Sequence, residues 1–235
     1  MKTILYPAVE RGHANHGWLN AHHTFSFASY YDEHKVHFGL LRVLNDDIIA
    51  GGTGFGTHPH DNMEIITIPL QGSLEHRDST GGHGIIKPGE VQVMSAGTGV
   101  YHSEFNASKT EPVNLFQIWI FPKERNITPR YDQRAFPESG RQENLQVLVS
   151  PRREEGMWIN QDAWLSRINL KAGSHFTYPV FKTGNGLFLL VIEGQVRVGD
   201  QSLGKRDAIG ISEFPEATLV AEAASEVLFI EVPMQ

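Results

Sequence analysis

The sequence predicts an all-β protein, on grounds of composition and of internal repetition. Twenty-three glycines and twelve prolines interrupt short runs that are rich in Val, Ile and Phe. Runs of about five such residues joined by turns are typical of β-strands. Apolar residues keep a helical period for no more than a few turns anywhere in the chain. A chain of 235 residues can bury its core as one large β domain or as two small ones, and an internal repeat favours two.

Nine runs carry the strand signal, because each is rich in strand-forming residues and is bounded by turn residues. In chain order the expected strands are 37–45, 64–70, 72–78, 90–95, 114–121, 145–150, 186–194, 195–199 and 226–233. At Gly72 and Gly194 the chain passes from one run to the next through a glycine turn. Each of these two places therefore predicts a strand–turn–strand unit.

The strand–turn–strand unit occurs once in each half of the chain. IPLQGSLEHRD (68–78) aligns with LVIEGQVRVGD (190–200), and Gly72 and Gly194 fall at the same position of the alignment. A repeat of this kind indicates duplication of one small β barrel rather than a single large sheet.

A second pair of segments supports the duplication and fixes the expected domain bounds. NLFQIWIFP (114–122) aligns with EVLFIEVPM (226–234). The polar, Pro-containing stretch after the first of these segments is the natural linker. We therefore expect a first domain at 1–122, a linker at 123–144 and a second domain at 145–235.

Composition excludes several classes of function. The formal net charge is −7, and Lys and Arg are scattered without a basic block, which argues against nucleic acid or an anionic membrane as the partner. The chain has no cysteine, so it has no disulfide, no thiolate metal site and no cysteine nucleophile. The N-terminal MKTILYPAVERG lacks the apolar core of a signal peptide, and no apolar run approaches the length of a membrane span. The expectation is a soluble, cytoplasmic and monomeric protein.

Two pairs of potential metal ligands stand out. His58 and His60 lie two residues apart in GTHPHDNMEI, and His102 and Glu104 have the same spacing in GTGVYHSEFN. Residues i and i+2 of a strand point to the same face, so each pair can offer both side chains to one ion. Two such pairs on facing strands of a small barrel would give three nitrogens and one carboxylate. This donor set suits one divalent ion, Fe(II) first and otherwise Mn, Ni, Cu or Zn, with room for substrate or oxygen.

The second half of the chain lacks the histidine pair. The segment THPH (57–60) precedes the hairpin of the first half, and TYPV (177–180) occupies the corresponding place in the second. The scaffold is therefore repeated while the two imidazoles are not. This difference indicates that the histidines have a chemical role rather than a role in folding.

The two metal motifs resemble those of a known superfamily. GGTGFGTHPHDNMEIITIPLQG (51–72) and PGEVQVMSAGTGVYHSEFN (88–106) look like the two motifs of the cupins. More narrowly, RGHANHGWLNAHHTFSFASYYD (11–32), FGTHPHDNMEI (55–65) and MSAGTGVYHSEFN (94–106) are similar to the pirin family. The match is close in the first half of the chain and covers only the general plan of the second.

The resemblance to pirins implies a fold and a site. The implied fold is a bicupin, two tandem cupin domains of the β-sandwich type, with a metal in the N-terminal domain only. The implied ligands are His58, His60, His102 and Glu104. The general cupin pattern instead takes its carboxylate from the first motif, where this chain has Glu64. An unbroken strand would place Glu64 about 13 Å beyond His60, but a turn at Asp61 and Asn62 could bring it back, so Glu64 is kept as an alternative ligand.

The resemblance also implies an activity. Bacterial pirin-like proteins are associated with quercetin 2,3-dioxygenase activity, in which O2 is consumed, a flavonol ring is opened and carbon monoxide is released. The expected substrates are therefore O2 and a flavonoid-like molecule, and Glu104 is the expected base for the flavonol 3-hydroxyl. The alternative is a non-enzymatic, metal-containing protein that acts as a redox-responsive interaction partner or transcriptional cofactor.

The remaining histidines and a polar strand residue have plainer interpretations. Four histidines near the N-terminus fit no single strand face and are expected in turns or on the surface; they are His13, His16, His22 and His23. His76 and His83 lie near a hairpin and a Gly-rich turn and are expected to be exposed, and His175 stands alone. Gln117 lies in an apolar strand, so it either lines the metal cavity or is a hydrogen-bonded core residue. Trp18, Phe25 and Phe27 are expected in the core or between the domains, or as a wall for a flat ligand.

Overall fold

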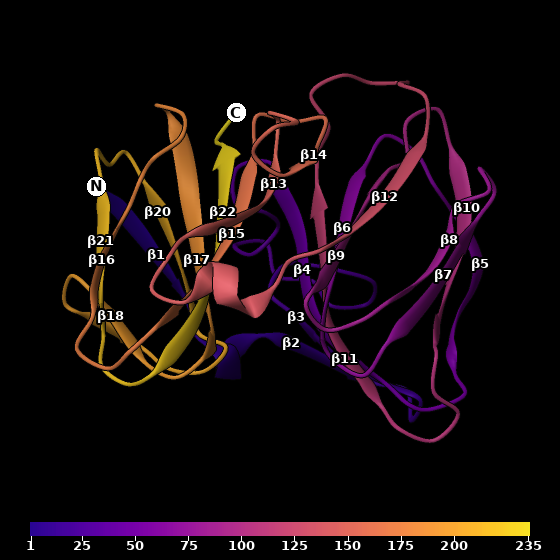
Figure 1. Cartoon of the computed structure of the whole chain (residues 1–235), viewed down its shortest axis with the longest axis horizontal. Helices are drawn as coiled ribbons and strands as arrows, with labels where there is room; N and C mark the ends of the chain where they lie inside the picture. Colours follow the sequence, from indigo (N-terminus) through magenta and orange to yellow (C-terminus); the bar gives the residue numbers. More distant parts are fainter.

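The computed structural model describes all 235 residues and is almost entirely β (Figure 1). The first half of the chain forms a seven-stranded and a four-stranded sheet. The seven-stranded sheet has the order β12 (Arg130–Ala135), β9 (Glu90–Ser95), β6 (Glu64–Gln71), β11 (Val113–Ile120), β4 (Leu41–Ile49), β3 (Leu19–His23) and β2 (Gly12–Asn15). The four-stranded sheet has the order β5 (Gly54–His60), β10 (Val100–Asn106), β7 (Leu74–Asp78) and β8 (His83–Ile86).

The second half repeats this arrangement, again with one seven-stranded and one four-stranded sheet. Its larger sheet has the order β1 (Lys2–Tyr6), β20 (Ala208–Ser212), β17 (Asn185–Glu193), β22 (Ser225–Pro233), β15 (Trp164–Leu170), β13 (Gln146–Ser150) and β14 (Met157–Trp158). Its smaller sheet has the order β16 (His175–Tyr178), β21 (Ala217–Ala221), β18 (Val196–Val198) and β19 (Gln201–Leu203). Two short 3-10 helices are the only helical elements, at Ala8–Glu10 and Glu138–Arg141.

The expected internal repeat is confirmed strand by strand. In the first half β11 pairs with β6 and β4, and in the second half β22 pairs with β17 and β15 in the same order. The turn glycines Gly72 and Gly194 both have positive φ angles, of 72° and 89°, which a glycine adopts without strain. The all-β, two-unit fold class predicted from the sequence is therefore correct. The first expected strand is the least accurate, because β4 begins at Leu41 and not at residue 37.

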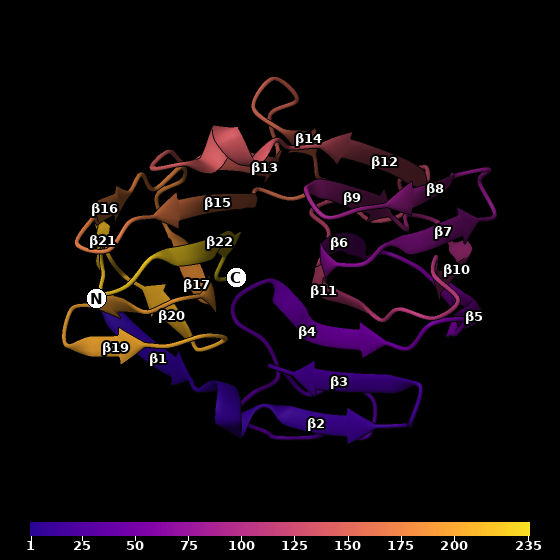
Figure 2. The ribbon, with the colours of Figure 1, turned by 60° about the horizontal axis from the view of Figure 1, so that its bottom comes forward.

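Two strands join sheets that the expected domain bounds would not assign to them. Strand β1 comes first in the sequence but pairs with β20 of the second half. Strand β12 lies inside the expected linker and pairs with β9 of the first half. Figure 2 shows β1 beside β20, and β12 beside β9. Each half thus receives an edge strand that the sequence analysis placed elsewhere, and the division at 1–122, 123–144 and 145–235 stays a prediction.

The main hydrophobic core lies between the two seven-stranded sheets. It contains 26 buried residues drawn from both halves, Phe116 and Phe188 among them. The interior of the second half holds one further cluster of 16 buried residues. The interior of the first half instead holds two separate clusters, of seven and four residues. Polar side chains divide the interior of the first half, and these side chains form the candidate site.

No helix of the structure has the length and apolar character needed to cross a membrane.

Candidate metal centre

Three of the four expected ligands come together on two neighbouring strands. His58 and His60 lie on β5, and His102 lies on β10, where its Cα atom is the register partner of that of His58. One nitrogen from each of the three rings lies within 4.8 Å of the others. The two motifs therefore meet as expected, but they lie side by side in one sheet and not on facing strands.

The ring nitrogens of His58 and His102 are available to an ion. The Nδ1–H group of His58 donates a hydrogen bond to the carbonyl of Gly56 over 2.8 Å, which leaves the lone pair on Nε2. Both ring nitrogens of His102 are buried without a hydrogen-bond partner. A buried imidazole in this state normally costs free energy unless a partner such as a metal ion is bound. The residues present therefore fit a divalent cation.

Burial keeps His60 and His102 neutral and ready to bind a cation. Desolvation and the neighbouring imidazole of His58 lower the pKa of His60 to about 4. The same causes lower the pKa of His102 to about 2. Only neutral imidazole binds a metal, so His60 and His102 are in their binding form throughout the physiological range of pH.

Glu104 is the fourth expected ligand and lies deeper in the protein. It follows a β-bulge in β10, and its carboxylate accepts hydrogen bonds from Gln117 Nε2 at 3.0 and 3.2 Å. Gln117 Oε1 in turn accepts a hydrogen bond from Thr67. Both interpretations of Gln117 thus hold, because it is satisfied by hydrogen bonds and also lines the cavity. Burial raises the pKa of Glu104 to about 7. A carboxylate atom of Glu104 lies within 4.8 Å of ring nitrogens of His76 and His102.

Glu64, the alternative ligand, has other partners. Its carboxylate accepts hydrogen bonds from the hydroxyl of Ser95 at 2.8 Å and from the backbone amide of Asn160 in the second half at 3.1 Å. It does not line the cavity that contains the histidines. Burial raises the pKa of Glu64 to about 7. Glu64 therefore connects the two halves of the chain and is separate from the histidine cluster.

A cavity of about 210 Å³ opens beside the histidines. Four of its lining residues are apolar; they are Phe27, Phe55, Ile65 and Trp119. The rings of Phe27 and Trp119 meet edge to face at 5.4 Å. A polar site with aromatic walls is typical of a pocket for a small, flat molecule. Phe27 therefore has the role of a wall, whereas Phe25 lies in the core between the halves and Trp18 packs on Phe55.

Asp47 is a lining residue that the sequence analysis missed. It lies on β4 with Asn45, and both side chains face the cavity. Burial, with a smaller contribution from the charges of Asp46 and Glu104, raises the pKa of Asp47 to about 8. Its Oδ1 atom has no hydrogen-bond partner. The signal was the spacing of Asn45 and Asp47, which lie two residues apart and so share one face of β4.

The expectation that His76 is exposed is wrong. His76 is completely buried on β7, and its ring centre lies 5.3 Å from that of His102. His83 is exposed, as expected. Of the four N-terminal histidines, His23 is also buried and contacts Asn45, so it is neither in a turn nor on the surface. His13 and His22 stack on each other at 4.7 Å.

The second half shows what the same scaffold holds without ligands. Tyr178 occupies the position that corresponds to His58, and its register partner on β21 is Ala217. Tyr178 packs against Phe229, with ring centres 4.9 Å apart, and Phe229 corresponds to Gln117. The ligand positions are thus filled by an apolar core that leaves no donor set.

Comparisons with known proteins agree with this geometry. A family model described as Pirin matches residues 7–120, and one described as Quercetinase C-terminal cupin domain matches residues 147–232. A quercetin 2,3-dioxygenase of Escherichia coli is 43% identical over 230 residues, which are 97% of this chain and 98% of that protein. The crystal structure of the bacterial pirin YhhW from Escherichia coli in complex with nickel(II) matches with a TM-score of 0.93 and 42% identity, covering 99% of each chain. A quercetin 2,3-dioxygenase from Acinetobacter baumannii matches with a TM-score of 0.77 and 27% identity, covering 97% of this chain and 85% of that chain. The chain therefore belongs to the pirin family, and both of its halves have the cupin fold.

Proposed function

We propose that this protein is a metal-dependent dioxygenase of the quercetin 2,3-dioxygenase type, which cleaves a flavonol with O2 and releases carbon monoxide. The observation that carries the proposal is a set of three imidazoles with available nitrogens, beside a buried carboxylate and an aromatic-walled cavity. The names of the relatives from Escherichia coli and Acinetobacter baumannii support the same reaction. The proposed location is the cytoplasm, and the proposed assembly state is a monomer.

The proposed ligands of the ion are His58, His60, His102 and Glu104. Three nitrogens and one oxygen suit Fe(II), which we propose as the native ion, and they also suit Mn, Ni, Cu or Zn. The nickel(II) complex of the related YhhW supports a divalent transition metal. When bound, such an ion supplies a Lewis acid that stabilises a neighbouring oxyanion.

Glu104 is the proposed base. A flavonol is activated toward oxygen when its 3-hydroxyl loses a proton, and Glu104 is a carboxylate that lines the cavity beside the histidines. Burial raises the pKa of Glu104 to about 7 before an ion binds, and a carboxylate in this position can accept the flavonol proton. Gln117 donates to both carboxylate oxygens and so holds Glu104 in one orientation. A carboxylate that also ligates the ion must loosen that bond when it takes the proton.

The cavity walls provide binding and exclude water. Phe27, Phe55 and Trp119 present ring faces and edges to a flat substrate. Burial of apolar substrate surface contributes about 25 cal/mol per Å². The unpartnered Oδ1 of Asp47, which also lines the cavity, offers a polar contact. The walls therefore favour a flat, hydroxylated aromatic molecule.

Oxygen consumption tests this function. Protein loaded with Fe(II) or another divalent ion should consume O2 in the presence of quercetin and bleach the visible absorbance of the flavonol. Glu104→Gln should lose most of this rate, because an amide can still ligate weakly through oxygen but cannot accept the proton. Removal of a general base typically costs about 10²–10⁴-fold in rate.

The matched control is Glu64→Gln, which changes an equally buried carboxylate outside the cavity. We expect it to retain most of the rate. A fully metal-loaded wild-type protein that consumes no oxygen with any flavonol would instead support the non-enzymatic role as a redox-responsive interaction partner. A fully active Glu104→Gln variant with its metal bound would show that another group is the base.

A further inference from the structure

Strand β7, which neighbours β10 on the side opposite β5, places two further polar side chains beside the proposed ligands. In the ladder between β10 and β7, the register partner of Glu104 is His76 and that of His102 is Asp78. Register partners project to the same face of a sheet, so His76 and Asp78 lie on the inward face with the ligands. Both side chains are essentially buried, with exposed fractions of 0% and 1%. Sequence spacing assigned neither of them to the site.

Asp78 fixes the position of the proton on His76. The Oδ2 atom of Asp78 lies 3.0 Å from Nε2 of His76. The Oδ1 atom of Asp78 accepts hydrogen bonds from the backbone and hydroxyl of Thr80 and from the backbone of Gly82, at 2.6–2.9 Å. A carboxylate can only accept hydrogen bonds, so Nε2 of His76 carries the hydrogen and Nδ1 carries a lone pair. The ring is also stacked on Tyr131 at 4.6 Å, which holds its orientation.

The free groups on His76 and His102 are complementary. Nδ1 of His76 is a buried acceptor with no donor, and both nitrogens of His102 are buried with no partner. If one nitrogen of His102 binds the ion, the other carries a hydrogen that needs an acceptor. The two ring centres are 5.3 Å apart. Two imidazoles joined by a hydrogen bond of about 3 Å have centres about 5 Å apart, so the spacing of the two rings suits such a bond.

We propose that His76 is a positioning residue that accepts the N–H of His102 facing away from the ion. The resulting chain runs from the ion through His102 and His76 to Asp78. It fixes the tautomer and the ring orientation of His102, and it raises the basicity of the nitrogen that ligates. This inference rests on the proposed metal site.

A matched pair of variants separates this role from simple packing. His76→Gln keeps an N–H group that can reach Asp78 but removes the acceptor at the position of Nδ1. His76→Asn places its side-chain oxygen close to the position of Nδ1 and so restores an acceptor. His83→Gln is the control, because His83 lies on the neighbouring strand β8 and is exposed. Folding of each variant is verified by circular dichroism and by its melting temperature.

The measurement is the affinity for nickel(II), by competition with a coloured chelator. We expect His76→Gln to bind nickel about 10–100-fold more weakly than the wild type, as is typical when the hydrogen-bond partner of a metal ligand is lost. His76→Asn should recover most of that loss, and His83→Gln should match the wild type. Equal affinities of His76→Gln and wild type would overturn the proposal. A wild type that binds no nickel would overturn the metal site itself, and this inference with it.

A second measurement excludes direct ligation by His76. Pulsed electron paramagnetic resonance of the copper(II)-loaded protein counts the imidazoles that bind the ion. We expect the same count in wild type and in His76→Gln, and a count lower by one would overturn the proposal, because His76 would then be a ligand. If His76→Gln does not fold, Asp78→Asn provides the same comparison, because it leaves the ring in place and removes the charge that orients it. Weaker binding of nickel then supports the proposal, and unchanged binding overturns it.

Discussion

Glu64 and Glu104 are both buried carboxyl groups whose surroundings give them different roles. Burial raises the pKa of each to about 7. Glu104 lies in the cavity under the amide of Gln117, where an ion or a substrate can reach it. Glu64 accepts hydrogen bonds from Ser95 and from the backbone of Asn160, so it connects the two halves. The partners of each carboxylate, and not its burial, thus separate a reactive group from a structural one.

Glu64 makes the stability of the protein depend on pH. Its pKa is about 7 in the folded protein against a usual value of 4.5, so the folded state holds the proton more tightly than the unfolded state. The free energy of unfolding should therefore fall as pH rises from about 4.5 to about 7, by up to about 2–3 kcal/mol from this group. Glu64→Gln keeps an acceptor oxygen and should flatten the curve in that window. Denaturant unfolding of both proteins at pH 5 and pH 8 measures the difference, and parallel curves would contradict the prediction.

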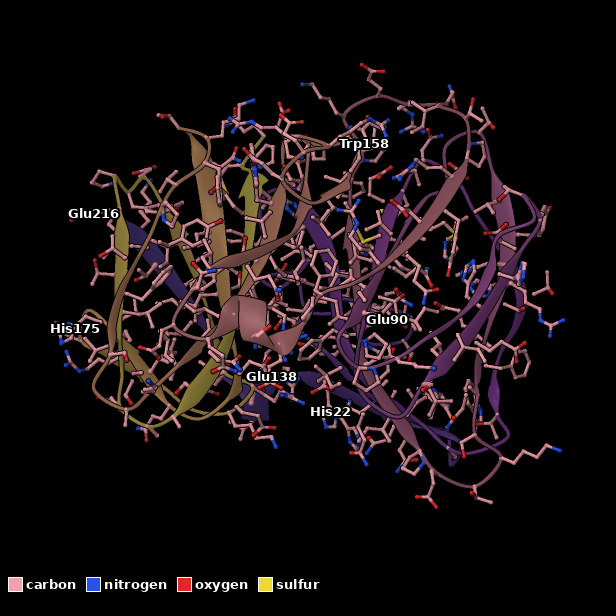
Figure 3. All side chains as sticks on the ribbon, viewed as in Figure 1. His22, Glu90, Glu138, Trp158, His175 and Glu216 are labelled. Atoms are coloured by element: carbon pink, nitrogen blue, oxygen red, sulfur yellow. The ribbon has the colours of Figure 1, made fainter.

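Metal content should depend on the histidines of the first half only. His58→Ala should lower bound metal substantially while the fold persists, because the apolar core between the sheets does not include this side chain. His175→Ala is the control: Figure 3 shows His175 at the outer side of the second half, on the exposed face of β16. Elemental analysis of protein purified without an affinity metal measures both. Equal metal in His58→Ala and wild type would remove His58 from the site.

At the scale of the strand, period-two alternation explains what the sequence could predict of the site. The pairs His58/His60 and His102/Glu104 are visible in the sequence, because each pair shares one face of its own strand. The burial of His76 is harder to see, although Leu74 on the same face of β7 is also fully buried. The neighbours of β10 are set by the strand order of the sheet, and the residue opposite Glu104 is set by the register between the two strands. A single sequence reveals neither for strands that are distant along the chain. The proximity of His76 to Glu104 was therefore beyond the sequence analysis.

The matching strands of the second half should not accept a metal when the histidines are restored. Tyr178→His combined with Val180→His recreates the HPH motif at the end of β16 and just beyond it. The positions on β21 hold Ala217 and Leu219, within an apolar cluster. The carboxylate that interacts with Tyr178 is Glu231, which already accepts hydrogen bonds from the backbone amides of Phe181 and Lys182. We expect the metal content to stay at that of the wild type and the melting temperature to fall, because a buried tyrosine is replaced by a polar ring. A second bound ion per chain would show that the motif alone is sufficient.

At the scale of the whole molecule, the two halves are held together by one continuous core. Phe188 of the second half packs against Phe25 and Phe38 of the first, with ring centres 5.6–5.7 Å apart. Arg206 forms a partly buried ion pair with Asp46 across the same boundary, at 2.8 Å. The duplication was readable from the sequence, because turn glycines and apolar runs recur. The placement of the edge strands β1 and β12 was not, because a short strand carries no signal for which sheet it joins.

The shared core predicts that the two halves unfold together and do not fold apart. The 26-residue cluster takes side chains from both seven-stranded sheets, so separation would expose a large apolar face on each half. A chain limited to 145–235 would also lack β1, which completes the edge of its sheet beside β20. We expect the full chain to melt in a single transition by calorimetry. The fragments 1–122 and 145–235, produced separately, should aggregate or lack a cooperative melt. Two resolved transitions in the full chain, or a fragment that melts cooperatively on its own, would show that the sheets stabilise each half without the core between them.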